Sequence, residues 1–251
     1  MAKFRLRIKD LLFPGIDILL RKRLKLAQKY LMAGTIETLD TGCGNGAFCL
    51  LCYKLGNSVL GIDIDADNIK RCLEYRDYKG IPGSKVSFRV LSIYNLLDLK
   101  QTFDQILYFE TLEHLLYDKN AIEVFAKLLN PDGVIHLGVP NLNCHFYLKT
   151  MISQSENRGH VRKGYTYLAL REMLGDFGLK IVKEDKYGDF FTRQVYTLYL
   201  RLQNSYLFKN FSKSVNEVKD VLTFLCLNPF TYLDSFLKTE PMSIYVMAKK
   251  I

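Results

Sequence analysis

Short apolar runs alternate with longer amphipathic segments from residue 36 onward. The runs are bounded by glycine, proline and polar residues, which is typical of buried strands. The segments between them repeat apolar residues every three or four positions, which predicts helices. We predict strands at 36–40, 58–64, 85–91, 103–109, 134–139, 179–186 and 242–249, and helices at 47–55, 66–78, 120–129 and 166–177.

This alternation of strands and helices predicts an α/β fold, with a parallel sheet and helices on both faces. An aromatic-rich stretch at about 188–241 separates the last two strands. Its segments RQVYTLYLRL and SVNEVKDVLTFL have helical spacing, so we predict a helical insertion. Loops of this length usually have structure or function of their own. The insertion is interpreted as two amphipathic helices covering the sheet, as a substrate lid, or as a surface that contacts lipid.

Length and composition agree with one globular domain. The chain has 251 residues, of which 49% are hydrophobic and 24% charged, values that are ordinary for a soluble protein. No apolar run approaches the roughly 18 residues that a membrane span requires. The first residues lack the pattern of a signal peptide. We therefore expect a cytoplasmic protein.

Positive charge is concentrated near the amino terminus. The chain carries a net charge of +9, and the first 29 residues, with nine basic and two acidic side chains, carry +7 of it. We divide the chain into a basic amphipathic segment, 1–30, and a main domain, 31–251. The segment suits peripheral contact with an anionic membrane surface or an acidic partner, or is a solvated helix packed at the domain edge. The nearly neutral main domain makes a nucleic-acid partner unlikely.

Six cysteines are present, and without a secretion signal we expect free thiols. Cys49 and Cys52 form a CxxC pair, but no second pair follows at the spacing of a zinc site. We interpret both as small core residues of a helix, with a metal or redox role as the alternative.

Three glycines lie between the strand 36–40 and the helix that follows. Gly42, Gly44 and Gly46 come directly after Asp40, in the stretch LDTGCGNGAF. Ligands of α/β proteins sit where a strand meets its crossover helix, and residues without Cβ atoms let a ligand approach the backbone. Asp63 ends the next strand, where an acid can accept hydrogen bonds from ribose hydroxyls. The pattern predicts a nucleoside site; the alternative is a tight turn without a ligand.

The acid before the glycines points to a particular nucleoside. Dinucleotide folds use G-x-G-x-x-G to cradle pyrophosphate, whereas here the pattern is D-x-G-x-G-x-G. A carboxylate at this position disfavours phosphate and favours a cation. S-adenosylmethionine has a sulfonium and an α-ammonium and no phosphate, so we predict it as the cofactor.

At this point the sequence resembles the class I S-adenosylmethionine-dependent methyltransferases. LDTGCGNGAF resembles their first motif, GIDID the acidic second motif, FDQILYFETLEHL the fourth-strand motif and LLNPDGVIHLGVPN a later segment. The resemblance covers about residues 30–187 and the final strand. It implies a Rossmann-like seven-stranded sheet of order 3-2-1-4-5-7-6, with the last strand antiparallel. The stretches E-x-L-E-H and GHVRKGYTYLALREMLGDFGLKIV are most similar to methyltransferases of small hydroxylated molecules, including ubiquinone-pathway O-methyltransferases.

The resemblance assigns cofactor roles to residues at the ends of the first four strands. Asp63 would hold the ribose, and Ile64 would pack on the adenine. Many members of the family have an acid after strand three for the adenine amino group, but this chain has Ser92, beside Ile93. Phe109 would line the inner side of the cofactor, or else is a core aromatic. The methionine part would lie among Asp40, Gly42, Cys43, Gly44 and Gly46.

Methyl transfer from a sulfonium needs an oriented acceptor, and a hydroxyl acceptor also gains from a base. His114, next to Glu113 at the end of strand four, is the first candidate because its pKa is near neutrality. His160 in the family's substrate-side segment is the second. Each histidine has a structural role as its alternative, and Arg162 could pair with an acidic acceptor. Glu110, Glu113 and His114 resemble a divalent-cation site of some relatives, but we predict no metal.

The sequence therefore predicts a cytoplasmic S-adenosylmethionine-dependent O-methyltransferase. The acceptor is expected to be a small molecule, a sugar or glycan, or a lipid-linked intermediate. One alternative is an RNA or protein methyltransferase, although strand four lacks the D/N-P-P-Y/F motif of base methylation. Another is a subunit that binds the cofactor without catalysis.

Overall fold

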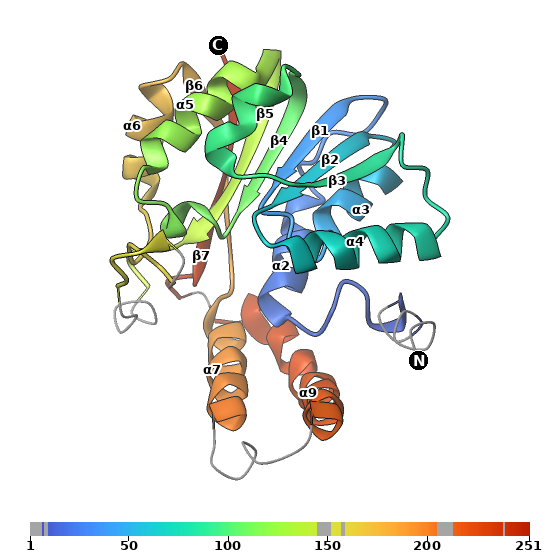
Figure 1. Ribbon diagram of the computed structural model, residues 1–251. Helices are drawn as coiled ribbons and strands as arrows, with labels where there is room; N and C mark the ends of the chain where they lie inside the picture. The colour runs from blue at the N-terminus through green and yellow to red at the C-terminus, as the bar shows by residue number, and fades with distance from the viewer. Residues whose placement is uncertain (1–6, 8–9, 145–151, 157–158, 205–212, 238) are drawn as a thin grey trace.

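The computed structural model describes residues 7, 10–144, 152–156, 159–204, 213–237 and 239–251; the rest of the predicted basic segment, 1–6 and 8–9, lies outside them. Seven strands form one sheet of order β3-β2-β1-β4-β5-β7-β6 (Figure 1). The strands are β1 (Glu37–Thr41), β2 (Ser58–Asp63), β3 (Val86–Val90), β4 (Phe103–Phe109), β5 (Leu129–Pro140), β6 (Leu179–Tyr187) and β7 (Ser243–Lys250).

The pairing directions confirm the predicted topology. Strands β1 to β5 pair in parallel, and β7 pairs antiparallel with both β5 and β6. Strand β6 therefore runs in the same direction as β5 and ends at the carboxyl edge of the sheet, where β7 begins. Consequently the insertion between β6 and β7 starts and finishes at the edge where α/β proteins bind ligands.

Helices cover both faces of the sheet, as predicted. Helices α2 (Ile18–Ala27), α3 (Ala47–Lys54) and α4 (Ala66–Tyr78) lie on one face, and α5 (Asp118–Leu128) and α6 (Tyr167–Gly175) on the other (Figure 1). Each face has its own apolar cluster, because each helix turns one apolar stripe toward the strands. Cys49 and Cys52 are fully buried on α3, which confirms them as core residues.

The insertion consists of α7 (Phe190–Asn204), α9 (Lys213–Leu227) and the 3₁₀ helix η5 (Asn228–Ser235). These helices extend beyond the carboxyl edge and do not cover a face of the sheet (Figure 1). Val195 of α7 and Phe224 of α9 pack on Ile18 of α2. The expectation that the helices cover the sheet was wrong, because Val195 and Phe224, buried apolar side chains of α7 and α9, pack on the amino-terminal helix instead.

Strand β5 begins five residues before its predicted start at 134. Leu129 pairs with Phe103, and regular pairing resumes at Val134 with Gln105, so four residues, 130–133, bulge out of the ladder. The Asn130 side chain donates to Asp104 at 2.8 Å and fastens the bulge to β4. The NPDG sequence thus marks a bulge inside a strand, because a side-chain bond replaces the missing ladder bonds.

Candidate active site

The glycine-rich loop joins β1 to α3 in a backbone that favours glycine. Gly42, Gly44 and Gly46 have φ angles of +70°, +53° and +76°. A Cβ atom on Gly42 would lie 2.8 Å from Oγ1 of Thr111, which follows β4. Since side chains are disfavoured in this conformation and blocked by this contact, the loop lies directly against the segment that leaves β4.

Asp63 ties the end of β2 to the glycine loop. Its carboxylate accepts hydrogen bonds from the backbone N–H of Gly44 at 2.9 Å, from that of Asp65 at 2.9 Å and from the Asn68 side chain at 3.3 Å. The next residue, Ile64, is apolar but 72% exposed. Asp63 and Ile64 are the two residues that the sequence analysis assigned to the ribose and the adenine. This assignment stays a prediction.

Asp40 lies beneath the loop rather than at its opening. Its side chain is 3% exposed, and the Cys49 thiol donates to it at 3.1 Å. Burial, reinforced by the nearby Asp63 charge, raises the pKa of Asp40 to about 7. A cation bound above the loop would favour the ionised form of this acid. Cys43 is also buried, and its N–H donates to Ile62 at 2.8 Å.

The three remaining predicted cofactor residues lie at the ends of β3 and β4. The Ser92 hydroxyl accepts from the Tyr94 N–H at 3.4 Å and caps the 3₁₀ helix η1 (Ile93–Leu99), whose first residue is half-buried. Phe109 is 7% exposed and stacks on Phe48 with ring centroids 4.3 Å apart. The Phe109 ring thus packs in the core, as its alternative role required; its contact with a cofactor stays a prediction.

The three predicted catalytic residues lie together. Glu113 and His114 belong to the short 3₁₀ helix η2 (Leu112–His114), and Val161 donates its N–H to the Glu113 carbonyl at 2.9 Å. This backbone bond brings His160 to the end of β4. The Nε2 atoms of His114 and His160 lie 3.8 and 4.0 Å from Oε1 of Glu113, and the two rings meet edge to face at 4.7 Å.

The cluster places a buried carboxyl between two imidazoles. Glu113 is 0% exposed, and neither carboxyl oxygen accepts a hydrogen bond within the described part of the chain. Burial, and then the charge of Glu110, raise the pKa of Glu113 well above its usual value. Burial and the neighbouring His114 lower the pKa of His160, which favours a neutral ring able to accept a proton. One ligand atom from each residue lies within 4.8 Å of the others, a spacing that one divalent cation could bridge.

Two neighbours of this cluster were missed from sequence. Tyr187, at the end of β6, donates its hydroxyl to Glu110 at 2.6 Å, and Arg23 of α2 lies 3.7 Å from the same carboxylate. Glu110 adopts a φ of +49°, an uncommon conformation for a residue other than glycine. Helical spacing gave one usable signal, because Arg23 lies four residues after the buried Leu19 and so falls on the buried face of α2.

Arg162 has a structural position. Its guanidinium donates to the Asp118 carboxylate at 2.5 Å and to the Leu115 carbonyl at 2.7 Å. These bonds fasten the segment carrying His160 to the start of α5. Because Arg162 is already paired with an acid, the geometry does not support the expected pairing with an acidic acceptor.

Comparison with known proteins decides the family. The family described as "Methyltransferase domain" matches residues 15–184, which is more than half of the chain. The chain belongs to this methyltransferase family. The predicted membership of the class I S-adenosylmethionine-dependent methyltransferases, and the similarity to ubiquinone-pathway members, are confirmed.

Several relatives share only part of their length with this chain. It is 28% identical over 130 residues to the mitochondrial ubiquinone biosynthesis O-methyltransferase of Bos taurus, covering 51% of this chain and 35% of the relative. Ubiquinone biosynthesis O-methyltransferase of Chelativorans sp. is 32% identical over 106 residues, covering 42% of this chain and 41% of the relative. The chain thus spans less than half the length of these two curated relatives.

Solved structures agree on the fold of nearly the whole chain. A SAM-dependent methyltransferase from Archaeoglobus fulgidus superposes with a TM-score of 0.60 and 22% identity, covering 95% of this chain and 96% of the other. N-methyltransferase NodS from Bradyrhizobium japonicum, crystallised with S-adenosyl-l-homocysteine, gives a TM-score of 0.54 and 17% identity, covering 92% and 86%. At these identities the likeness establishes the fold alone.

Proposed function

We propose that this protein transfers a methyl group from S-adenosylmethionine to a hydroxyl of a small molecule, a sugar or glycan, or a lipid-linked intermediate. The observation that carries the proposal is that the glycine-rich loop lies next to the segment that holds Glu113 and His114. Gly42 lies so near Thr111 that a Cβ on it would be 2.8 Å from the Thr111 Oγ1, and Glu113 and His114 follow within three residues of Thr111. A cofactor on the glycine loop would therefore have its reactive end close to the two histidines.

The residues around the loop fit the cofactor. A Cβ on Gly44 would have only the Gly42 carbonyl near it, at 4.0 Å, so a ligand can approach the loop there; Asp63 presents a carboxylate, and Ile64 presents an exposed apolar side chain for a flat ring. Asp40, whose burial is costly for an unbalanced negative charge, would be stabilised by a cationic ligand nearby. When bound, S-adenosylmethionine supplies a methyl group already activated by its sulfonium.

The histidine cluster suits a hydroxyl acceptor. A hydroxyl must lose its proton as the new C–O bond forms, so a neutral imidazole within hydrogen-bond reach accelerates the step. His160 is favoured in the neutral form, and His114 is the more exposed of the pair, with its side chain 35% accessible. We propose that His114 accepts the proton of the acceptor hydroxyl, and that His160 and Glu113 orient the His114 ring. A cation bridging these residues is the second candidate, favoured by the buried carboxyl of Glu113, which accepts no hydrogen bond from the described residues.

Peripheral membrane contact through the basic amino terminus remains part of the proposal. No helix of sufficient length and apolar character for a bilayer span occurs among the residues that the structure describes. RNA or protein methylation, and cofactor binding without catalysis, are the competing functions.

The test is methyl transfer by the full chain from radiolabelled S-adenosylmethionine to a panel of acceptors. The panel contains phenols, sugars, lipid-linked hydroxyl compounds, RNA and a protein extract, each run with and without a chelator. We expect label in a hydroxyl compound and a rate that survives chelation. Label only in RNA or protein would overturn the acceptor class. Cofactor binding without any transfer would favour the non-catalytic subunit. If chelation lowers the rate and a divalent cation restores it, then a bound cation, and not His114 as a base, activates the hydroxyl.

A further inference from the structure

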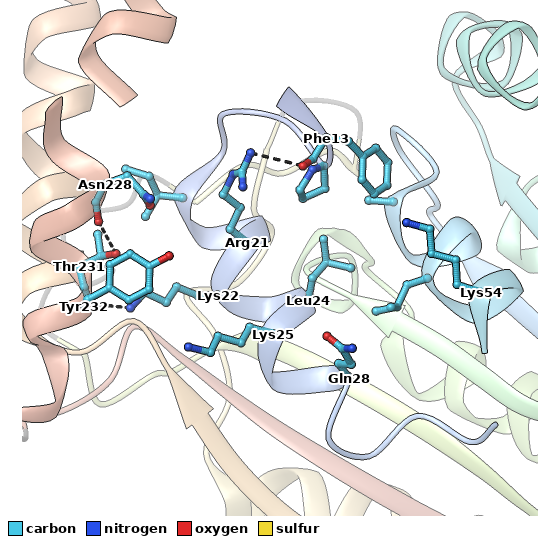
Figure 2. A pocket seen from close by; sticks show the side chains of 14 residues that line it. Phe13, Arg21, Lys22, Leu24, Lys25, Gln28, Lys54, Asn228, Thr231 and Tyr232 are labelled. Atoms are coloured by element: carbon cyan, nitrogen blue, oxygen red, sulfur yellow. Dashed lines mark hydrogen bonds between the residues drawn. The ribbon is translucent and has the colours of Figure 1, made fainter. Parts of the chain in front are cut away.

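A cavity of about 310 Å³ lies between α2, α3 and η5, outside the residues of the active site (Figure 2). Its wall is assembled from three distant parts of the chain: the loop and helix around residues 13–28, the outer side of α3, and the short helix η5 after the insertion. The cavity therefore exists only because the insertion packs against the amino-terminal helix.

Four cationic side chains line this cavity. Arg21, Lys22 and Lys25 come from α2, and Lys54 comes from α3 on the opposite side (Figure 2). Their charge is only partly balanced, since Lys22 pairs with Asp234 at 3.1 Å.

Among the described residues, no ion pair balances the charge of the other three cations. Arg21 donates to the backbone carbonyls of Gly15 at 2.7 Å and Leu12 at 2.6 Å, which are uncharged acceptors. Lys25 and Lys54 form no ion pair with any described residue; the nearby Asp10 interacts with the Lys54 charge but is bonded to Lys79 at 2.9 Å. The cavity thus has a surplus of positive charge.

Apolar surface adjoins the charged groups. Phe13, Ile18 and Leu24 form part of the wall, and the ring of Tyr232 lies 5.6 Å from the ammonium groups of both Lys22 and Lys25. On and just after η5, the exposed fractions of Phe230, Tyr232 and Phe236 are 54%, 63% and 77%. An uncovered aromatic ring next to cations, as Tyr232 is here, is typical of surfaces that meet both an anionic group and a hydrocarbon chain.

We propose that this cavity binds the phosphate group of an amphipathic phosphate ester. A phosphate carries between one and two negative charges and several acceptor oxygens, so it can engage more than one of these cations at once. The neighbouring aromatic side chains of η5 would contact the apolar part of the ligand. The phosphate could belong to a lipid headgroup in a membrane or to a soluble phosphate ester, and the proposal holds whichever acceptor the enzyme methylates.

The test uses the full chain, a double variant of the cavity and a matched control. Lys25→Gln with Lys54→Gln removes two charges from the rim of the cavity. Lys70→Gln with Lys183→Gln removes two charges from exposed lysines elsewhere. Binding is measured by co-sedimentation with phosphatidylcholine vesicles with and without phosphatidylglycerol, and by calorimetry with glycerol 3-phosphate. Affinity for S-adenosylmethionine, expected to be unchanged in both variants, verifies that each variant is folded.

We expect vesicle binding that requires phosphatidylglycerol and that falls about 30-fold in the cavity variant, since two lysines near an anionic surface together contribute about 2 kcal/mol and about 1.36 kcal/mol corresponds to a factor of ten. The control variant should lose markedly less of its affinity for these vesicles. Binding of glycerol 3-phosphate, lost in the cavity variant, with no vesicle binding would assign the site to a soluble ester. The proposal is overturned if neither probe binds, or if the cavity and control variants weaken binding equally.

Discussion

Arg23 of α2 lies 3.7 Å from the carboxylate of Glu110, the residue that follows β4. Tyr187, at the end of β6, donates its hydroxyl to the same oxygen. Three elements that are far apart in sequence therefore converge on one acid beside the proposed catalytic histidines. The amino-terminal helix thus contributes a side chain to the site; helical spacing puts Arg23 on the buried face of α2 but does not show that it meets Glu110.

Replacing Arg23 should destabilise the protein. The Arg23 side chain is 13% exposed, so Arg23→Met would leave Glu110 buried without its cation and cost about 3 kcal/mol of unfolding free energy. Urea denaturation measures this difference. Lys29→Met is the control, because the Lys29 side chain is 59% exposed in its pair with Asp185 and should cost less than about 1 kcal/mol. Equal losses in the two variants would show that the Arg23 pair is not a buried one.

Removing the Asp63 carboxylate should weaken S-adenosylmethionine binding about tenfold or more, since hydrogen bonds to a charged group contribute about 1.5–3 kcal/mol. Calorimetry on Asp63→Ala measures the affinity. Asp63→Asn, which keeps an acceptor for the Gly44 N–H, separates loop support from ribose binding. Asp67→Ala, in the first turn of α4, is the control for general loss of an acid. Unchanged affinity in Asp63→Ala would show that Asp63 does not bind the ribose.

The charge state of Asp40 should couple pH to stability and to cofactor binding. Its pKa is about 7 in the folded protein, against 3.8 for an unperturbed aspartate. Because the unfolded chain ionises first, the free protein should lose stability as pH rises from about 4 to 7. Asp40→Asn should lack this loss, as followed by thermal melting across that range.

Cofactor affinity should change in the opposite direction. A sulfonium favours ionised Asp40, so affinity for S-adenosylmethionine should rise as pH increases through 7. Comparing the wild type with Asp40→Asn cancels the titration of the cofactor's own amine. Parallel pH profiles in the two proteins would show that Asp40 does not sense the ligand.

Loss of the proposed base should slow transfer without affecting cofactor binding. His114→Ala should lower kcat on the order of 100-fold, because general-base contributions are about 10²–10⁴-fold, while calorimetry reports unchanged S-adenosylmethionine affinity. His160→Asn, which keeps a hydrogen-bonding side chain, should show a smaller decrease. If His114→Ala retains full activity, the proton is taken by another group.

Much of the fold followed from local pattern. The helix at 66–78 and the strand at 103–109 have the predicted boundaries, because each has a strong periodic repeat and clear ends. The start of β5 was misplaced because a bulge fastened by Asn130 has no periodic signature. The packing partner of the insertion helices was also predicted wrongly. An amphipathic pattern indicates that one face of a helix is buried, but it does not indicate which element covers that face.

The sequence by itself determined the family, the strand order through that family, and the glycine loop with its following acid, because these depend on residues that are near neighbours or on spacing along the chain. Only the tertiary structure decided which distant side chains meet, His160 with His114 and both Arg23 and Tyr187 with Glu110, and that lysines of α2 and α3 line one cavity. The physical reason is that such contacts arise from packing between elements, and packing depends on shape and burial over the whole chain.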